Sequence, residues 1–490
     1  MIKTKFGFIV LALLFAFTIY ANLTINKIFS SYMVLQQEHP ITFFGTATPN
    51  KKVDVKFAGL KQIVLSNDKG FWQVTFPKMI ATYKPKELVV KCENKTIKLK
   101  DLLIGEVWFC AGQSNMALFI GKKYIKNRSI FNAEEVLKNS NNPHIRYAYQ
   151  RTNPSWTTQD AKFMWSSRWL KSKESKAYYF SALAYLFAQQ LNRDLDVPVG
   201  VIVSAVGATK IQSWIPEDFL TSFEKENKII LANKNNLHTK VSDSFPSVLY
   251  NGMVASWTKL PIRGVIWYQG EANSKTEQSR YYHLHKALIS SYRSKWNNEN
   301  MPFLIVQLAG YDKVNGAKYQ EVDPNVFNGF AVIREMQQRM LELPNVGLAT
   351  AIDIGEYDTI HPGNKLDVAI RLALEAKRIA YNWNITSRGP LIKKIIPENN
   401  QVRIVFDYAK NLHTIDKKNP NGFAVAGADG KFYWGQAKIE GNIVVVSSPK
   451  VLKPIHVKYA YVGYRGDLNL RNEANLPAYP FTSIPSKITP

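Results

Sequence analysis

The stretch that decides the fold is Gly105 to Met116, which reads GEVWFCAGQSNM. Its apolar part predicts a strand that ends at Gly112, and Ser114 follows in a turn. A glycine at such a turn permits tight backbone geometry and leaves the following amides free to point at a developing oxyanion. The stretch therefore predicts a strand, a turn and a candidate nucleophile. A polar turn in which Ser114 or Asn115 caps a helix is the alternative.

The residues around this stretch, from about 101 to 390, alternate between apolar strand patterns and helical patterns. Such alternation is typical of a parallel sheet covered by helices on both faces, and it predicts an α/β fold. The clearest strand candidates are Val199–Val203, Gly264–Tyr268 and Phe303–Val306.

A helix is predicted from about Lys365 to Ala380. Its pattern is amphipathic, because its charged and apolar residues fall on different faces. The charged face holds Asp367, Arg371, Glu375 and Arg378, and the apolar face holds Leu366, Ile370, Ala373 and Leu374.

The flanking regions, 22–100 and 391–490, show short strand patterns separated by turns, and each predicts a β-rich region. Residues 1–21 combine a cationic lead with an uncharged apolar run of signal-peptide length, and Ala21 is a plausible cleavage residue. We expect a secreted or periplasmic protein with no stable membrane insertion after cleavage. A retained anchor is the alternative.

The composition is that of a well-cored globular protein: of 490 residues, 46% are hydrophobic, and the net charge is +25. No block of five or six like charges occurs, so a nucleic-acid partner is not expected. Cys92 and Cys110 are the two cysteines. They allow at most one disulfide, and two buried thiols are an equally good interpretation.

A second candidate stretch is Asp353 to Lys365, which reads DIGEYDTIHPGNK. Asp358 stands three residues before His361, so its carboxylate could accept the imidazole Nδ1–H and leave Nε2 to take a proton from a serine. A helix-entry turn and a metal ligand are the alternatives. The metal interpretation is weaker, because the eight His are scattered and two Cys cannot form a zinc knuckle.

Two more loops follow predicted strands. Ser204–Thr209 (SAVGAT) offers backbone amides, and Trp267–Asn273 (WYQGEAN) offers the side-chain donors Gln269 and Asn273. Loops at the carboxyl ends of parallel strands converge on one crevice, so these groups could meet Ser114 and His361 there. Glu271 could be a general base, or a buried acid bonded to loop amides.

These motifs together resemble the sialate O-acetylesterase family of SGNH hydrolases, a group that also includes acetyl xylan esterases. The resemblance rests on GQSNM at 112–116, WYQGEAN at 267–273 and Asp358-x-x-His361-Pro362. Further matching segments are MVLQQ at 33–37, LYNGM at 249–253 and NLRNEANLPAYPF at 469–481. The resemblance implies an SGNH-hydrolase-like sheet in residues 101–390.

The family pattern implies Ser114 as nucleophile, His361 as general base and then acid, and Asp358 as the orienting carboxylate. It implies an oxyanion hole from the amides of Ser114 and Gly207 and the side chain of Gln269 or Asn273. We expect Gln113, Glu271 and Gln212 to contact these groups and hold them in position, without contacting the reacting atoms themselves. Two residues depart from the pattern: Ala208 replaces a glycine, and Gln212 replaces a glutamate. Ala208 makes the role of Gly207 less secure.

The resemblance implies a serine esterase that removes O-acetyl groups from sialic acids through an acetyl-serine intermediate. Acyl transfer needs a nucleophile, a base and oxyanion donors, so no metal or cofactor is expected. The expected partner is an O-acetylated sugar. An acetyl xylan or other polysaccharide deacetylase is the alternative enzyme, and a non-catalytic carbohydrate-binding protein is the alternative from another class.

Overall fold

The structure, a computed structural model, describes residues 23–121, 129–164, 168–234, 241–314, 318 and 322–489. The predicted signal segment, residues 1–21, lies outside them. The chain divides into two compact units. One holds residues 23–26, Thr42–Phe76 and Glu87–Lys98, and the other holds Lys27–Ile41, Pro77–Lys86 and the chain from Leu99 onward.

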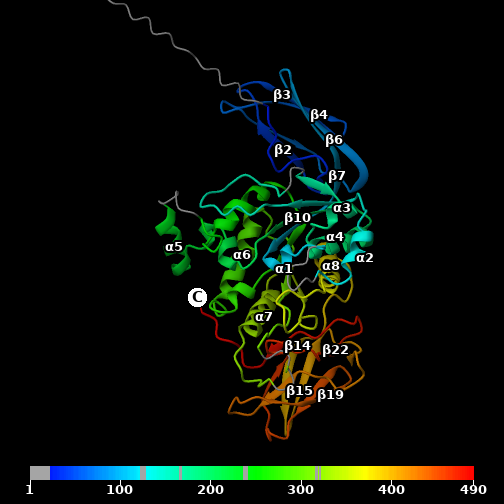
Figure 1. Cartoon of the computed structure of the whole chain (residues 1–490), viewed down its shortest axis with the longest axis vertical. Coiled ribbons are helices and arrows are strands. Elements are labelled where there is room, and N and C mark those ends of the chain that lie inside the picture. Colours follow the sequence, from blue (N-terminus) through cyan, green and yellow to red (C-terminus); the bar gives the residue numbers. More distant parts are fainter. Residues whose placement is uncertain are drawn as a thin grey trace, which may run out of the picture. The chain divides into compact units, whose positions relative to one another are not determined.

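The larger unit is built on a mostly parallel sheet, as predicted (Figure 1). Its strands follow the order β13, β12, β11, β7, β10, β8, β9, and every neighbouring pair is parallel except β8 with β9. The strands are β7 (Lys95–Gly112), β8 (Ile145–Tyr149), β9 (Trp169–Lys171), β10 (Val199–Ala205), β11 (Gly264–Tyr268), β12 (Phe303–Gln307) and β13 (Val346–Thr350). All residues of β10, β11, β12 and β13 are buried, which explains their continuous apolar sequences.

Helices cover this sheet. Helix α4 (Ala182–Leu195) packs against α8 (Leu366–Ala380), and the two contact β10 and β13 respectively. Helix α6 (Tyr281–Lys295) packs against α7 (Gly329–Arg339), which contacts β12. Figure 1 shows α6 on one side of β10 and the pair α4 and α8 on the other. The shorter helices are α1 (Ser114–Ala117), α2 (Ala133–Lys138), α3 (Glu174–Ala177) and α5 (Glu224–Lys234). The α/β prediction is confirmed.

Helix α8 begins one residue after the predicted start. Its faces differ from those of a simple amphipathic helix, because charged residues are buried and apolar residues are partly exposed. Arg371 and Glu375 are buried, whereas Leu366 and Ile370 are 39% and 36% exposed. The buried charges have partners: Arg371 binds both carboxylate oxygens of Asp353 at 2.7 and 2.8 Å, and Glu375 binds Arg388 at 3.0 and 3.1 Å. A helical pattern cannot reveal such partners, because they come from other segments.

The smaller unit is all β, as its sequence predicts. Strand β2 (Ile41–Thr46) pairs with β5 (Phe71–Phe76), and β3 (Lys52–Phe57) lies between β4 (Leu60–Leu65) and β6 (Thr82–Cys92). Val53, Val55 and Phe57 alternate with more exposed residues along β3, so one face of the strand is buried. Strand β1 (Val34–Gln36) belongs to the larger unit and runs parallel to β7.

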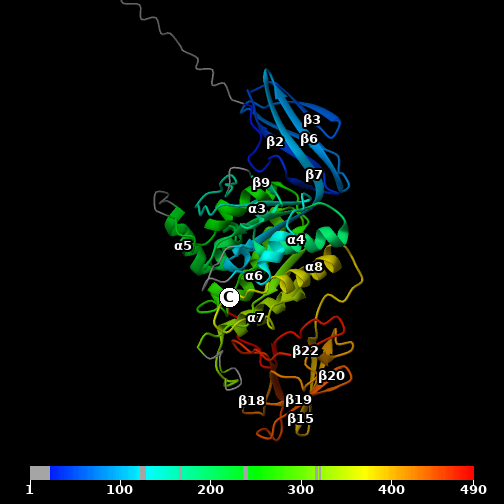
Figure 2. The same ribbon diagram turned by 45° about the vertical axis from the view of Figure 1, so that its right-hand side comes forward.

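Residues 391–490 form antiparallel sheets in the larger unit (Figure 2). One sheet has the order β14, β15, β20, β19, another has the order β18, β17, β21, β23, and β16 pairs with β22. Their bounds are β14 (Leu391–Glu398), β15 (Gln401–Asp407), β16 (His413–Thr414), β17 (Phe423–Ala426), β18 (Tyr433–Trp434), β19 (Gln436–Glu440), β20 (Ile443–Ser447), β21 (His456–Tyr459), β22 (Leu470–Arg471) and β23 (Phe481–Thr482). Val402, Ile404, Val444 and Val457 form their common core with Ile352, which follows β13.

Both cysteines are buried free thiols, so no disulfide links Cys92 with Cys110 in this structure. Within the described ranges, no helix has the length and apolarity needed to cross a membrane.

Candidate functional site

The parallel register brings three loops to one edge of the sheet. Gly112, the last residue of β7, lies opposite Ala205 at the end of β10 and opposite Tyr268 at the end of β11. The loops that carry Ser114, Gly207 and Gln269 therefore begin at the same level, as the sequence predicted.

Gly112 allows the close approach on which this edge depends. Its φ is +143°, and a Cβ at this position would overlap the backbone carbonyl of Tyr268. The amide of Gln113 donates to that same carbonyl oxygen at 3.0 Å. The chain then turns into the short helix α1, which begins at the half-buried Ser114.

The side chains of Ser114 and His361 meet directly. Ser114 Oγ lies 2.7 Å from His361 Nε2, although 247 residues separate them in the chain. The loop of His361 is held by its own side chains: the amide of His361 donates to Thr359 Oγ1 at 3.1 Å, and the amide of Gly363 donates to Glu356 Oε1 at 2.8 Å. This arrangement provides a hydroxyl with a hydrogen-bonded imidazole, which is the core of nucleophilic catalysis by serine.

Burial, together with the nearby cation of Lys365, lowers the pKa of His361 to about 4. The imidazole is therefore neutral at pH 7 and free to accept a proton. Its Nδ1 is buried and has no hydrogen-bond partner. The hydrogen bond expected from Nδ1 to Asp358 is thus not formed in this structure, and Asp358 is half-buried three residues away along the loop.

Asn115, the residue after Ser114, is the centre of a buried polar network. Its Nδ2 donates to Glu271 Oε1 at 2.6 Å and to the backbone oxygen of Ile360 at 3.0 Å. Its Oδ1 accepts from Lys365 Nζ at 2.7 Å. Burial raises the pKa of Glu271, an effect that the Asn115 hydrogen bond opposes, and burial lowers the pKa of Lys365 to about 7. Glu271 is therefore a buried acid that binds the side-chain amide of Asn115, whereas the sequence interpretation was an acid bonded to loop amides.

Gly207 lies beside Ser114. A Cβ built on Gly207 would be 3.5 Å from the Cβ of Ser114, and both Gly207 and Ala208 are exposed. Ala208 has a φ of +60°, in the left-handed region that favours glycine. The residue that departs from the family pattern therefore keeps a glycine-like backbone conformation.

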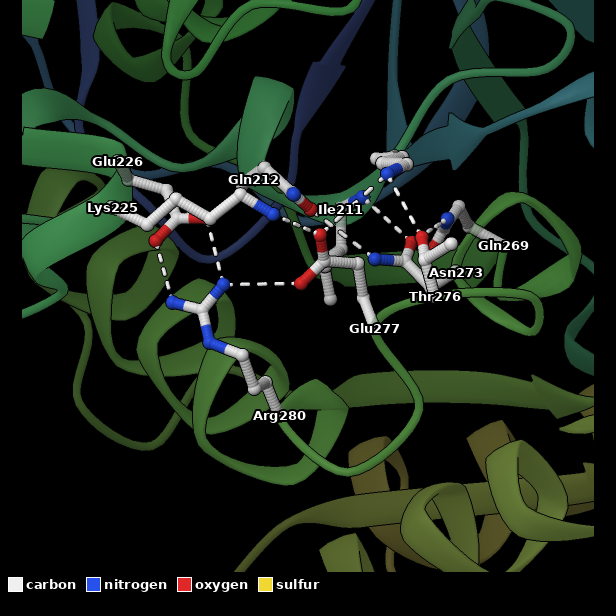
Figure 3. A network of polar contacts seen from close by, with 10 residues as sticks. Ile211, Gln212, Lys225, Glu226, Gln269, Asn273, Thr276, Glu277 and Arg280 are labelled. Carbon is white, nitrogen blue, oxygen red and sulfur yellow. Dashed lines mark hydrogen bonds and ion pairs between the residues drawn. The ribbon is translucent and has the colours of Figure 1, made fainter. Parts of the chain in front are cut away.

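Gln269, Asn273 and Gln212 form a chain of carboxamides (Figure 3). Gln269 Nε2 donates to Asn273 Oδ1 at 2.7 Å and to the backbone oxygen of Thr209 at 3.1 Å, which uses both of its hydrogens. Asn273 Nδ2 donates to Gln212 Oε1 at 3.2 Å, and Asn273 Oδ1 also accepts from the amide of Ile211. Because an amide nitrogen has two hydrogens, Asn273 retains one hydrogen beyond these contacts.

A cluster of charged side chains lies next to the turn that carries Asn273 (Figure 3). It consists of Lys225, Glu226, Glu277 and Arg280. The amide of Glu277 donates to the backbone oxygen of Asn273 at 3.0 Å. The carboxylate of Glu277 binds Lys225 at 2.5 Å and Arg280 at 3.0 Å, and Arg280 also binds Glu226 at 2.6 Å. These pairs join α5 to the turn before α6.

Gln113 also has a supporting role. Its Oε1 accepts from the amides of Gly270 and Ala272 at 3.5 and 3.4 Å, so it holds the loop that carries Glu271 and Asn273.

Sequence reasoning missed the roles of Asn115 and Lys365, although both lie in the two candidate stretches. The only available signal was their position, one residue after Ser114 and four residues after His361. Among the described residues, no three His, Cys, Asp or Glu side chains are grouped so that they could hold a metal ion.

Comparison with known proteins gives consistent matches. The family described as carbohydrate esterase, sialic acid-specific acetylesterase matches residues 104–376. Sialate O-acetylesterase of Mus musculus is 27% identical over 453 residues, covering 79% of this chain and 80% of that protein. The enzyme of that name from Homo sapiens is 30% identical over 334 residues, covering 62% and 58%. The crystal structure of a carbohydrate acetylesterase from Xanthomonas citri has a TM-score of 0.83 and 30% identity, covering 94% of this chain and 99% of that one.

The backbone of Ala208 provides a stability test. Replacing Ala208 by glycine removes the Cβ that disfavours positive φ, so we expect the free energy of unfolding to rise by about 1 kcal/mol. Thermal and urea denaturation would measure it. Ala205→Gly, at the buried end of strand β10, is the matched control and should lower stability, because the added glycine gives the unfolded chain more conformational freedom to lose on folding. A loss of stability in Ala208→Gly would contradict the strain argument.

Proposed function

Because the chain belongs to the sialic acid-specific acetylesterase family of carbohydrate esterases, we propose that it removes O-acetyl groups from sialic acids by way of an acetyl ester on Ser114. The observation that carries the proposal is the 2.7 Å contact between Ser114 Oγ and His361 Nε2. This contact lies at the edge of the sheet where β7, β10 and β11 end.

The reaction has two halves. His361 Nε2 takes the proton of Ser114 while Oγ bonds to the acetyl carbon. The resulting oxyanion collapses, the sugar oxygen leaves, and it takes the proton from the imidazolium. Water then attacks the acetyl-serine with the same help from His361, and acetate is released. Neutral His361 is suited to this work, because the base must be unprotonated when substrate arrives.

We assign the oxyanion donors to the amides of Ser114 and Gly207 and to Asn273 Nδ2. Gly207 is supported by its position beside Ser114. Asn273 is favoured over Gln269, because both hydrogens of Gln269 Nε2 are already engaged, whereas Asn273 retains one. Gln212 then orients Asn273 from behind.

Asp358 is our proposed partner for His361 Nδ1. A buried Nδ1–H without an acceptor costs free energy, and the imidazolium formed during acylation would raise that cost. Catalytic hydrogen bonds are often long or absent before substrate binds and tighten in the complex. Asp358 stands on the same loop, three residues before His361, which is the spacing of the family pattern.

We also propose that the protein is exported. The support is the amino-terminal sequence, with its cationic lead and apolar run. A broader activity on acetylated sugars is the second candidate, and it is favoured by the similarity to a carbohydrate acetylesterase over nearly the whole chain.

A substrate panel tests the reaction and its range. We expect the wild-type protein to release acetate from 9-O-acetylated sialic acid, and Ser114→Ala or His361→Ala to lower the rate by at least about 10⁴-fold. Acetylated xylan, assayed in parallel, separates the two candidates. Circular dichroism would confirm that the variants fold. Wild-type activity in either variant would refute the assignment.

Asn273→Ala tests the oxyanion donor. We expect kcat to fall by about 10²–10³ with little change in KM, because the lost hydrogen bond forms mainly in the transition state. Asn472→Ala is the control: this buried asparagine holds the backbone oxygens of Arg388 and Tyr408, and its loss should lower stability but not kcat. An unchanged kcat in Asn273→Ala would show that Asn273 is not an oxyanion donor.

The pH profile tests the state of His361 in the free enzyme. Protonation of the imidazole removes the base, so kcat/KM should fall as pH decreases through about 4 and should be level above it. Stopped assays of acetate release would measure this. An acid limb near or above the ordinary histidine value would show that Asp358 already binds Nδ1 before substrate arrives.

A further inference from the structure

The carboxamide of Asn115 joins three parts of the site that are far apart in the chain. It belongs to the residue that follows Ser114, and it contacts the residue that precedes His361, the acid Glu271 from the end of β11, and Lys365 at the entry of α8. Each of its polar atoms is engaged, because Nδ2 has two acceptors and Oδ1 has the ammonium donor. The spacing of Ser114 and His361 therefore depends on how this amide is held.

Charge fixes the direction in which the amide points. Its NH₂ faces the carboxylate of Glu271 and its oxygen faces the ammonium of Lys365, and a flipped amide would put like partners together at both ends. Asn115, Lys365 and Glu271 are 2%, 1% and 7% exposed, so water competes little for these contacts. Hydrogen bonds to charged groups are stronger than neutral ones, particularly in a dry environment.

Lys365 is unusual for a lysine, because its side chain is buried and no carboxylate among the described residues forms an ion pair with it. Its Nζ binds Asn115 Oδ1 and lies 5.5 Å from the ring centroid of Tyr268. The charged groups that act on this ammonium are Glu271, across Asn115, and Glu356, from the loop of His361. Asp358 stands on that loop as well. Burial of an ammonium group costs free energy, and this cost points to a role for Lys365 other than packing.

We propose that Lys365 is a positioning residue of the esterase site. Through Asn115 it holds the turn of Ser114 against the loop of His361, and it places a buried positive charge four residues after that imidazole.

The proposal rests on the proposed function and adds a residue that does not touch the reacting atoms. Two consequences can be separated. The tie through Asn115 affects the alignment of Ser114 with His361, and therefore kcat. The charge affects the protonation of His361, and therefore the acid limb of kcat/KM. Burial lowers the pKa of Lys365 only to about 7, so the residue carries its charge throughout the acid range in which this limb is measured.

Two substitutions of Lys365 form the test. Lys365→Met removes both the charge and the hydrogen bond, whereas Lys365→Gln removes the charge and keeps a donor for Asn115 Oδ1. We expect the acid limb to move upward by roughly one pH unit in both variants, because a neighbouring cation no longer opposes protonation of His361. We expect kcat to fall by roughly tenfold to a hundredfold in Lys365→Met and by less in Lys365→Gln, with KM nearly unchanged.

Lys377→Met is the matched control. Lys377 is also on α8 and pairs with Asp194 at 2.8 Å, so its loss should affect stability while the acid limb and kcat stay at their wild-type values. Circular dichroism and thermal denaturation would give the folded state of each variant, and acetate release from an O-acetylated sugar would give the kinetics.

The possible outcomes lead to different conclusions. Folded Lys365 variants whose acid limb stays in the wild-type position would overturn the proposal, and so would failure of both variants to fold, since that would make Lys365 a residue of the core. Acetate release by the wild-type protein, and its loss in Ser114→Ala, are measured first. If these fail, the proposed function is wrong, and the role of Lys365 is no longer the question.

Discussion

The close approach of β7 and β11 at Gly112 is the constraint on which the site depends. No side chain fits between this residue and the carbonyl of Tyr268, so only glycine lets the two strands end side by side. Ser114 follows two residues later, and the loop of Gln269 and Asn273 leaves the neighbouring strand at the same level. The sheet itself thus brings together the groups that we propose for bond formation and for oxyanion binding, and the loops only have to orient them.

A second constraint is that charged side chains in the protein interior, where water does not solvate them, need oppositely charged partners. Asp353 follows β13 and leads into the loop of His361. Burial alone would raise the pKa of Asp353, but Arg371 from α8 and Arg471 from β22 lower it and keep it ionised. The β-rich carboxyl-terminal region therefore contributes directly to the segment that leads to His361. Arg471, in the sequence NLRNEANLPAYPF, completes this buried ion pair with Asp353.

The sequence was sufficient for the strands, because a continuous apolar run is a local pattern. The strand–glycine–serine turn, also a local pattern, singled out Ser114 as a candidate nucleophile. It was insufficient where a residue's role depends on its partners. Helical periodicity placed Arg371 and Glu375 on the charged face of the helix, yet both are buried, and Asp353 and Arg388 neutralise them. Asn115 and Lys365 are separated by 250 residues, and no local pattern indicates that their side chains meet. Likewise, Gln269 and Asn273 differ in which of their amide hydrogens are bonded, and this depends on Thr209 and Gln212, which lie in another segment.

His361 has a buried Nδ1 without a hydrogen-bond partner, and it is subject to two opposing requirements. Its imidazole must be neutral before the reaction, and the imidazolium must be stabilised as it forms. A base with a pKa near 4 is unprotonated at any physiological pH, but it is also weakly basic, and proton transfer is most efficient when the pKa of the base lies near the operating pH. Such a base can serve an esterase only if something stabilises the imidazolium as it forms. Lys365 acts in the opposite sense, and Ser114 occupies Nε2, so the stabilising group must act at Nδ1. Within the loop of His361, Asp358 is the carboxylate at the spacing that suits this role. Substrate binding expels water from the site and strengthens every charge interaction in it, which is when an Nδ1–H to carboxylate bond becomes most favourable. A base kept neutral at rest and supported only during the reaction is therefore the arrangement that the buried charges around His361 favour.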